Sequence, residues 1–256
     1  MGPEFWLFAA VGFAAQLVDG ALGMAYGVVS TTVLLANGVP PAAASASVHA
    51  AKVFTGAASA ASHIAHRNVD WRLMLLLSLG GVLGGVVGTF VLTSIDGDLI
   101  KPYVVGWLGL MGVVILYRAW KGARPKPFSW KSPFPLGLVG GFFDAVGGGG
   151  WGPVVTSTLL GSGAEPRKAI GTTNAAEAFV AAAISATFLA ALVTGHWESG
   201  GLKQYLWSVL GLIGGGVVAA PIAGWMVKIL PLRALTWIVG LLVTGLAIWQ
   251  GLVLLL

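Results

Sequence analysis

Ionisable residues recur at matching places in the two halves of an otherwise apolar chain. Asp19 and Asp144 are 125 positions apart, and so are Lys52 and Glu177. An ionisable side chain inside a membrane costs about 2.5–3.5 kcal/mol on insertion scales, so it normally pairs or lines a pathway. Lys52 and Glu177 therefore predict an ion pair, or a coupled substrate and proton site, where the halves meet. Asp19 and Asp144 can each cap a helical turn, bind a cation or carry a proton.

These pairs belong to a repeat without gaps. At the same shift, identical or similar residues pair Tyr26 with Trp151, Gly27 with Gly152, Thr31 with Thr156, and Phe54 with Phe179. Two copies of a glycine-broken apolar unit are typical of transporters built from internal repeats.

The composition is that of a membrane protein. Of 256 residues, 57% are hydrophobic and 9% are charged, whereas soluble domains carry roughly 25% charged residues. No cysteine is present, which excludes disulfides and thiolate chemistry. No His and acidic residues have metal-ligand spacing, and no catalytic triad is evident. We therefore expect a lipid bilayer as partner, no nucleic acid, no metal or other cofactor, and no enzymatic activity.

Long apolar segments divide the chain into two units. The predicted first repeat, 1–120, has a broken segment at 5–36 and helices at 42–65, 72–93 and 99–118. The predicted second repeat, 133–256, has a broken segment at 133–162 and helices at 167–193, 204–228 and 234–255. About 20 apolar residues span a bilayer as a helix. Each of the six helices fits one crossing, and each broken segment is expected to be two half-helices joined by an unwound tip.

Loop charges choose between two arrangements of the broken segments. The basic linker 121–132 is cytoplasmic by the positive-inside rule. If both broken segments cross the membrane, the cations of 161–168 and 228–233 move outside; if both are re-entrant, those cations stay inside. The second arrangement is favoured. It predicts an all-α polytopic protein of the inner (cytoplasmic) membrane, with two inverted repeats, each a re-entrant helical hairpin plus three transmembrane helices.

The residues that follow each break could bind an anion. A helix that begins inside the membrane presents free backbone N–H groups and a partial positive charge. Glycine allows close backbone approach there, although it can also merely permit a tight turn. The candidate substrate-binding residues of the tips are Gly23, Tyr26, Gly27, Gly148, Gly149, Gly150, Trp151 and Gly152.

A second polar motif follows each broken segment, within the first turns of a long apolar helix. Its candidate members are Ser47, His49 and Lys52 in the first half, and Thr172, Thr173, Asn174 and Glu177 in the second. Hydroxyl, amide and imidazole groups could bond an oxyanion; alternatively, Ser and Thr only cap or back-bond within the helix. We expect the substrate between the two tips and these helix starts.

The stretches 16–27 and 140–153 closely resemble the TauE/SafE sulfite-exporter family, and 166–169 and 171–174 also fit it. The resemblance implies a secondary active transporter that exports small sulfur-containing oxyanions, such as sulfite or organosulfonates. Alternating access would move one helix bundle against the other, and a homodimer is a possible assembly. The family pattern implies an acidic residue where Lys52 stands, so this lysine adds positive charge. A passive anion channel, or a transporter of another small organic anion, is the alternative.

Overall fold

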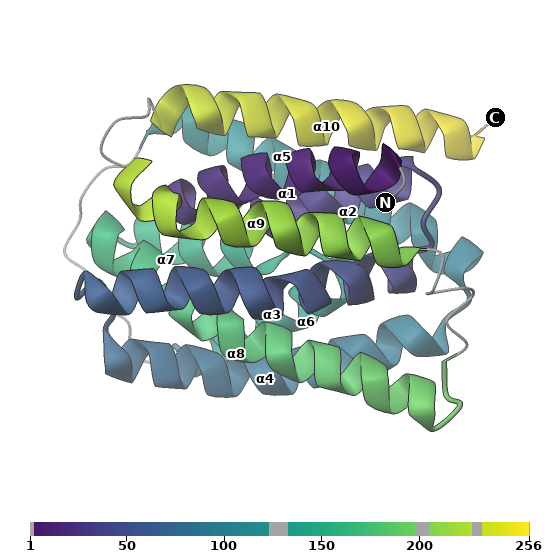
Figure 1. Ribbon diagram of the computed structural model, residues 1–256, viewed down its shortest axis with the longest axis horizontal. Helices are drawn as coiled ribbons and strands as arrows, with labels where there is room; N and C mark the ends of the chain where they lie inside the picture. Colours follow the sequence, from purple (N-terminus) through teal and green to yellow (C-terminus); the bar gives the residue numbers. More distant parts are fainter. Residues whose placement is uncertain (1–2, 123–132, 198–204, 227–231, 256) are drawn as a thin grey trace.

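The protein is a bundle of helices in the computed structural model, which describes residues 3–122, 133–197, 205–226 and 232–255 (Figure 1). In the first half the helices are α1 (Pro3–Leu22), α2 (Tyr26–Ala36), α3 (Pro41–Ala65), α4 (Trp71–Ser94) and α5 (Gly97–Lys121). In the second half they are α6 (Phe134–Gly147), a π-helical turn η1 (Gly152–Thr156), α7 (Ser157–Gly161), α8 (Pro166–Val193), α9 (Leu206–Met226) and α10 (Leu232–Leu255). No strand occurs in the described ranges, so the all-α expectation is confirmed. Most of the predicted linker 121–132 lies outside them.

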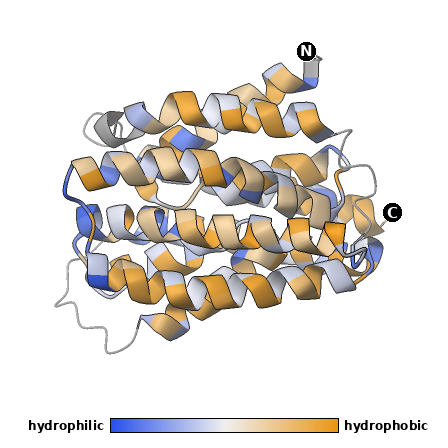
Figure 2. Ribbon diagram, turned by 60° about the horizontal axis from the view of Figure 1, so that its bottom comes forward, coloured by the Kyte–Doolittle hydropathy of each residue, from blue (hydrophilic) through white to orange (hydrophobic). Residues whose placement is uncertain are grey.

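The helices are those of a multi-pass membrane protein. Within the described residues, five helices are long and apolar enough to cross a membrane: α1 from Glu4, α4, α5, α8, and α10 from Thr236. Helix α4 exposes Leu75, Leu79 and Leu83 at four-residue spacing, which is the outward stripe expected of a helix facing lipid. Figure 2 shows hydrophobic residues along the helices and hydrophilic residues gathered near the ends of the bundle.

Glycines bring α4 against α6 and α1 against α9. A Cβ atom at Gly84 would collide with the backbone of Leu138 in α6, and a Cβ at Gly215 would collide with the backbone of Ala9 in α1. Small residues allow membrane helices to approach backbone to backbone. The first arm of each broken segment is therefore held along its length by a long helix from the other half.

Both broken segments turn at a glycine with left-handed backbone. Helix α1 leads into Gly23 (φ 67°), and α6 into Gly148 (φ 65°), a conformation that glycine adopts without a Cβ penalty. The arms differ in length from the expected half-helices, because α1 has 20 residues whereas α6 has 14. The return arm α2, with 11 residues, is about 16 Å long. The π-turn η1 opens the other return arm, and such irregular turns are frequent at functional sites.

Polar contacts gather several cations at one end of the bundle. Lys168 donates to the carbonyl of Arg67 at 2.9 Å, which ties the start of α8 to the α3–α4 turn. Arg233 donates to the carbonyl of Ala119 at 3.0 Å, which ties the start of α10 to the end of α5. We refer to this as the basic end.

Candidate functional site

Asp19 and Asp144 cap the return arms of the two broken segments. Each uses its Oδ1 atom to accept two backbone N–H bonds, at 2.8 and 3.1 Å. The donors are Ala25 and Tyr26 for Asp19, and Gly150 and Trp151 for Asp144. Of the alternatives left open for these carboxylates, capping is the one this geometry displays. Four of the tip N–H groups considered for an oxyanion are thus already bonded to the chain's own carboxylates.

Three further N–H groups at the tips have no partner within the described ranges. Among the described residues, no acceptor is bonded to the backbone N–H of Gly27, Val28 or Gly152. All three residues line a small central cavity between the tips. A buried N–H group without an acceptor costs about 1–3 kcal/mol. These groups are therefore available to an acceptor that the cavity admits.

The two tips lie directly against each other. Gly27 of the first lies against Gly149 of the second, and Gly152 of the second lies against Met24 of the first. A Cβ at Gly27 would stand only 2.8 Å from the Cα atom of Gly149. Glycine is required here because a side chain would push the tips apart.

A charged cluster lies beside the contact between the two tips. The Nζ atom of Lys52 is 2.6 Å from Oε1 of Glu177 and 3.1 Å from both carboxylate oxygens of Asp144. The Nε2 atom of His49 lies 3.1 Å from Oδ2 of Asp144. All four side chains are buried. The structure thus brings Lys52 and Glu177 together, and adds Asp144 and His49 to the pair.

The central cavity is closed in this conformation. The gap between its walls is too narrow to hold a water molecule. Its ionisable lining residues are Asp19, Lys52, Asp144 and Glu177. Among the described lining residues, three carboxylates therefore surround one ammonium group.

The remaining tip residues shape or anchor the tips and do not line this cavity. The Tyr26 hydroxyl donates to the carbonyl of Leu212 in α9 at 3.0 Å. The Trp151 indole N–H donates to the carbonyl of Thr173 in α8 at 3.0 Å. Both rings are fully buried, so they fasten the tips to neighbouring helices. The turns themselves contain Gly23, Gly148 and Gly150.

Most of the polar helix starts point elsewhere. The Thr172 hydroxyl accepts from the N–H of Asp70 at 2.9 Å. The Asn174 amide lies 3.3 Å from Nε2 of His63. Both contacts hold the start of α8 to the α3–α4 region. The Ser47 hydroxyl is buried, and no partner for it is found among the described residues. None of the three lines the central cavity.

Thr31 and Thr156 make contacts at the tips, although neither was a candidate site residue from the sequence. The Thr31 hydroxyl donates to the carbonyl of Gly148 at 2.7 Å, which links the first return arm to the second tip. The Thr156 hydroxyl donates to the Thr173 hydroxyl at 2.9 Å. The sequence feature that could have identified them is that threonine occupies both positions, which are 125 residues apart. The cavity residues Met24, Val28 and Pro153 carried no such signal.

Comparisons with known proteins identify the family of this chain. The family described as "Sulfite exporter TauE/SafE" matches residues 8–249. A curated relative from Bacillus subtilis (strain 168), the "Probable membrane transporter protein YtnM", is 46% identical over 229 residues, covering 87% of this chain and 74% of the relative. No solved structure matches. The chain is a membrane transporter rather than an enzyme, and it belongs to the TauE/SafE sulfite exporter family.

Proposed function

We propose that the protein is a secondary active transporter that exports small sulfur-containing oxyanions, sulfite or organosulfonates, from the cytoplasm by alternating access. The family description, a sulfite exporter, supports this substrate class. The observation that carries the proposal is the closed cavity at the crossing of the tips. It combines the ammonium group of Lys52 with tip N–H groups that have no acceptor in the part of the chain that the structure describes.

An oxyanion would supply acceptors for the hydrogen-bond donors of this cavity. Its oxygens would accept from Lys52 and from the N–H groups of Gly27, Val28 and Gly152. Charge-assisted hydrogen bonds of this kind are roughly twice as strong as neutral ones. Because the gap does not hold even a water molecule, the tips and the helices behind them must separate to load the anion. A site that opens only by such a movement supports alternating access rather than a continuous pore.

The negative charge of the cavity carboxylates favours the uptake of a proton. Three carboxylates and one ammonium leave the cavity negative when all are ionised, and two like charges about 4 Å apart repel by about 4 kcal/mol at an effective dielectric constant of 20. We infer that a proton joins the cluster when the anion binds. Glu177 is the proposed acceptor, since the described structure bonds its carboxylate to Lys52 alone, whereas Asp144 is also held by His49 and two N–H groups. Protonated Glu177 would release Lys52 to the anion.

Reciprocal contacts support two inverted repeats, 1–120 and 133–256. Gly27 against Gly149 and Met24 against Gly152 are exchanged by the 125-residue shift, as a two-fold rotation requires. The related helices α3 and α8 run antiparallel, because His63 meets Asn174 while Gly56, earlier in α3, meets Ala178, later in α8. A two-fold axis in the membrane plane relates helices in this way.

The arms of the second broken segment support a re-entrant path. Helix α6 runs parallel to α4, since Gly80 lies against Phe134 and Gly88 lies against Phe142. Helix α4 begins at the basic end, and so α6 starts toward that end. The return arm α7 finishes toward the same end, where Ser157 is bonded to Arg118 of α5. The cytoplasmic membrane and the homodimer stay predictions from the sequence.

Counterflow in proteoliposomes tests the proposal. Vesicles loaded with unlabelled taurine or sulfite should accumulate labelled taurine or sulfite in a saturable way, and a matched carboxylate such as acetate should compete poorly. Ohmic single-channel currents would refute the carrier mechanism. Saturable exchange of carboxylates without sulfonates or sulfite would refute the substrate class.

Glu177→Gln tests the proton. The wild type should move protons together with the anion, as read by a pH dye inside the vesicles, and Glu177→Gln should uncouple anion counterflow from that signal. The matched control is Glu165→Gln, since Glu165 is an exposed glutamate at the N-cap position of α8 whose side chain makes no cap bond. Proton movement that survives in Glu177→Gln would remove Glu177 from the mechanism.

A further inference from the structure

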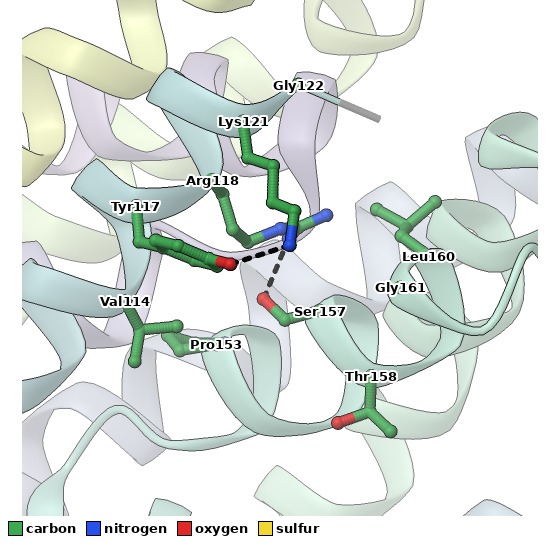
Figure 3. A pocket seen from close by; sticks show the side chains of 10 residues that line it. All are labelled: Val114, Tyr117, Arg118, Lys121, Gly122, Pro153, Ser157, Thr158, Leu160 and Gly161. Atoms are coloured by element: carbon green, nitrogen blue, oxygen red, sulfur yellow. Dashed lines mark hydrogen bonds between the residues drawn. The ribbon is translucent and has the colours of Figure 1, made fainter. Parts of the chain in front are cut away.

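A separate pocket opens beside the central cavity, toward the basic end (Figure 3). It has a volume of about 530 Å³ and lies between the end of α5 and the return arm formed by η1 and α7. Its polar lining consists of Tyr117, Arg118, Lys121, Ser157 and Thr158. The volume exceeds what a small sulfonate or sulfate ion occupies, and ligand sites of about 300–1,000 Å³ are common.

The two cations are held in the pocket without an acidic partner. The Arg118 guanidinium donates to the Ser157 hydroxyl at 2.7 Å and lies 3.3 Å from the sulfur of Met24. The Lys121 ammonium donates to the Tyr117 hydroxyl at 2.7 Å, as Figure 3 shows. Among the described residues, no carboxylate forms an ion pair with either cation. Cations near a helix C-terminus commonly bond its last carbonyls, but Arg118 is directed away from α5 to another arm.

The pocket adjoins the central cavity. Pro153 lines both of them. A second pocket of about 300 Å³, on the other side of Arg118, shares Met24 with the central cavity and also contains Arg233. Arg118 therefore lies directly behind the wall of the central cavity, and its guanidinium is in contact with Met24 of the first tip.

We infer that the Arg118 pocket is a second anion-binding site, which receives a sulfonate-type or sulfate-type oxyanion at the basic end before the anion enters the central cavity. The inference rests on the proposed function for its role in transport. Guanidinium binds the paired oxygens of such anions in a fork, with Ser157 and Lys121 as further donors. A basic recess with apolar walls concentrates anions at its mouth. Because the guanidinium contacts Met24, an anion bound there would lie next to the wall of the central cavity.

Cysteine modification tests the site without relying on transport. The chain has no cysteine, so Thr158→Cys introduces one thiol into the pocket and Thr194→Cys introduces one at the exposed far end of α8. In inverted membrane vesicles, the thiol introduced by Thr158→Cys should react about tenfold faster with an anionic than with a cationic methanethiosulfonate. Methanesulfonate or sulfate, but not the cation choline, should protect it. The thiol introduced by Thr194→Cys, read in right-side-out vesicles, should show neither effect.

Arg118→Gln in the Thr158→Cys background should abolish both the charge preference and the protection. Arg72→Gln is the matched control, because Arg72 is an exposed cation at the start of α4 and does not line the pocket. Retained preference and protection in Arg118→Gln, or their loss in Arg72→Gln, would overturn the inference. If both effects follow Arg118 while proteoliposomes carry no sulfite or sulfonate, the anion site stands and the proposed function fails. If transport occurs but the thiol shows neither charge preference nor protection, the proposed function is supported and the Arg118 anion site is refuted.

Discussion

The two tips use the same local device in different electrostatic surroundings. Asp19 and Asp144 each accept two N–H bonds from the return arm that follows. Asp144 also contacts Lys52 and His49, whereas no cation among the described residues pairs with Asp19. The second tip is thus tied to α3 by charge, and the first tip is not.

The difference originates in α3 and α8 rather than in the tips. At the repeat shift, Lys52 corresponds to Glu177 and His49 to Asn174. Both positively charged or basic groups are on α3, and both are directed to Asp144. The two caps have the same local geometry, and the residues of α3 make the Asp144 cap part of a charge cluster. Under the proposed function, this asymmetry would let different residues bind the proton and the anion.

Exchanging Lys52 and Glu177 should disturb the second tip more than any other change. In the double variant Lys52→Glu with Glu177→Lys, the new glutamate would lie beside Asp144 in a buried site. Leaving such charges uncompensated costs about 3–5 kcal/mol. We expect the double variant to be no more stable than Lys52→Glu alone and to be inactive, as measured by thermal unfolding in detergent and by counterflow. Recovery of both would mean that Lys52 pairs with Glu177 independently of Asp144.

Asparagine substitutions should separate the two tips. Asn keeps an oxygen that can accept the tip N–H bonds, so Asp19→Asn should cost at most about 1–2 kcal/mol. Asp144→Asn also removes the partner of Lys52 and His49, and should cost about 3–5 kcal/mol. Melting temperatures of the two purified variants measure the difference. Equal destabilisation would show that the contacts with α3 add nothing to the cap.

The threonines should give the smallest effect. Thr31→Val removes the hydroxyl that donates to the Gly148 carbonyl, a loss of about 0.5–1.5 kcal/mol. Thr156→Val should cost less, because the Thr173 hydroxyl keeps its own bond to the carbonyl of Ala169. Thermal unfolding of both variants measures the order, and a larger loss in Thr156→Val would reverse it.

Local patterns predicted the breaks better than they predicted the site. An Asp followed four residues later by Gly23 or Gly148 marked both turns, because a carboxylate cap and a left-handed glycine are local requirements. Their place in the first turns of a helix put Thr172 and Asn174 in a polar motif, but the sequence did not indicate which neighbour that motif would meet. The structure turns both toward the α3–α4 region. Likewise, the sequence did not indicate that α1 would pack along α9.

By itself, the sequence determined a multi-pass helical protein with two glycine breaks at equivalent positions, each carrying an aspartate. These features need only hydropathy, chain length and contacts within a few residues. The tertiary structure decided that Lys52 reaches Asp144 as well as Glu177, and that Arg118 stands beside the tips with no acidic partner among the described residues. The reason is that charges buried in a membrane choose partners by proximity across helices, and that proximity depends on how closely the glycine-lined helices pack.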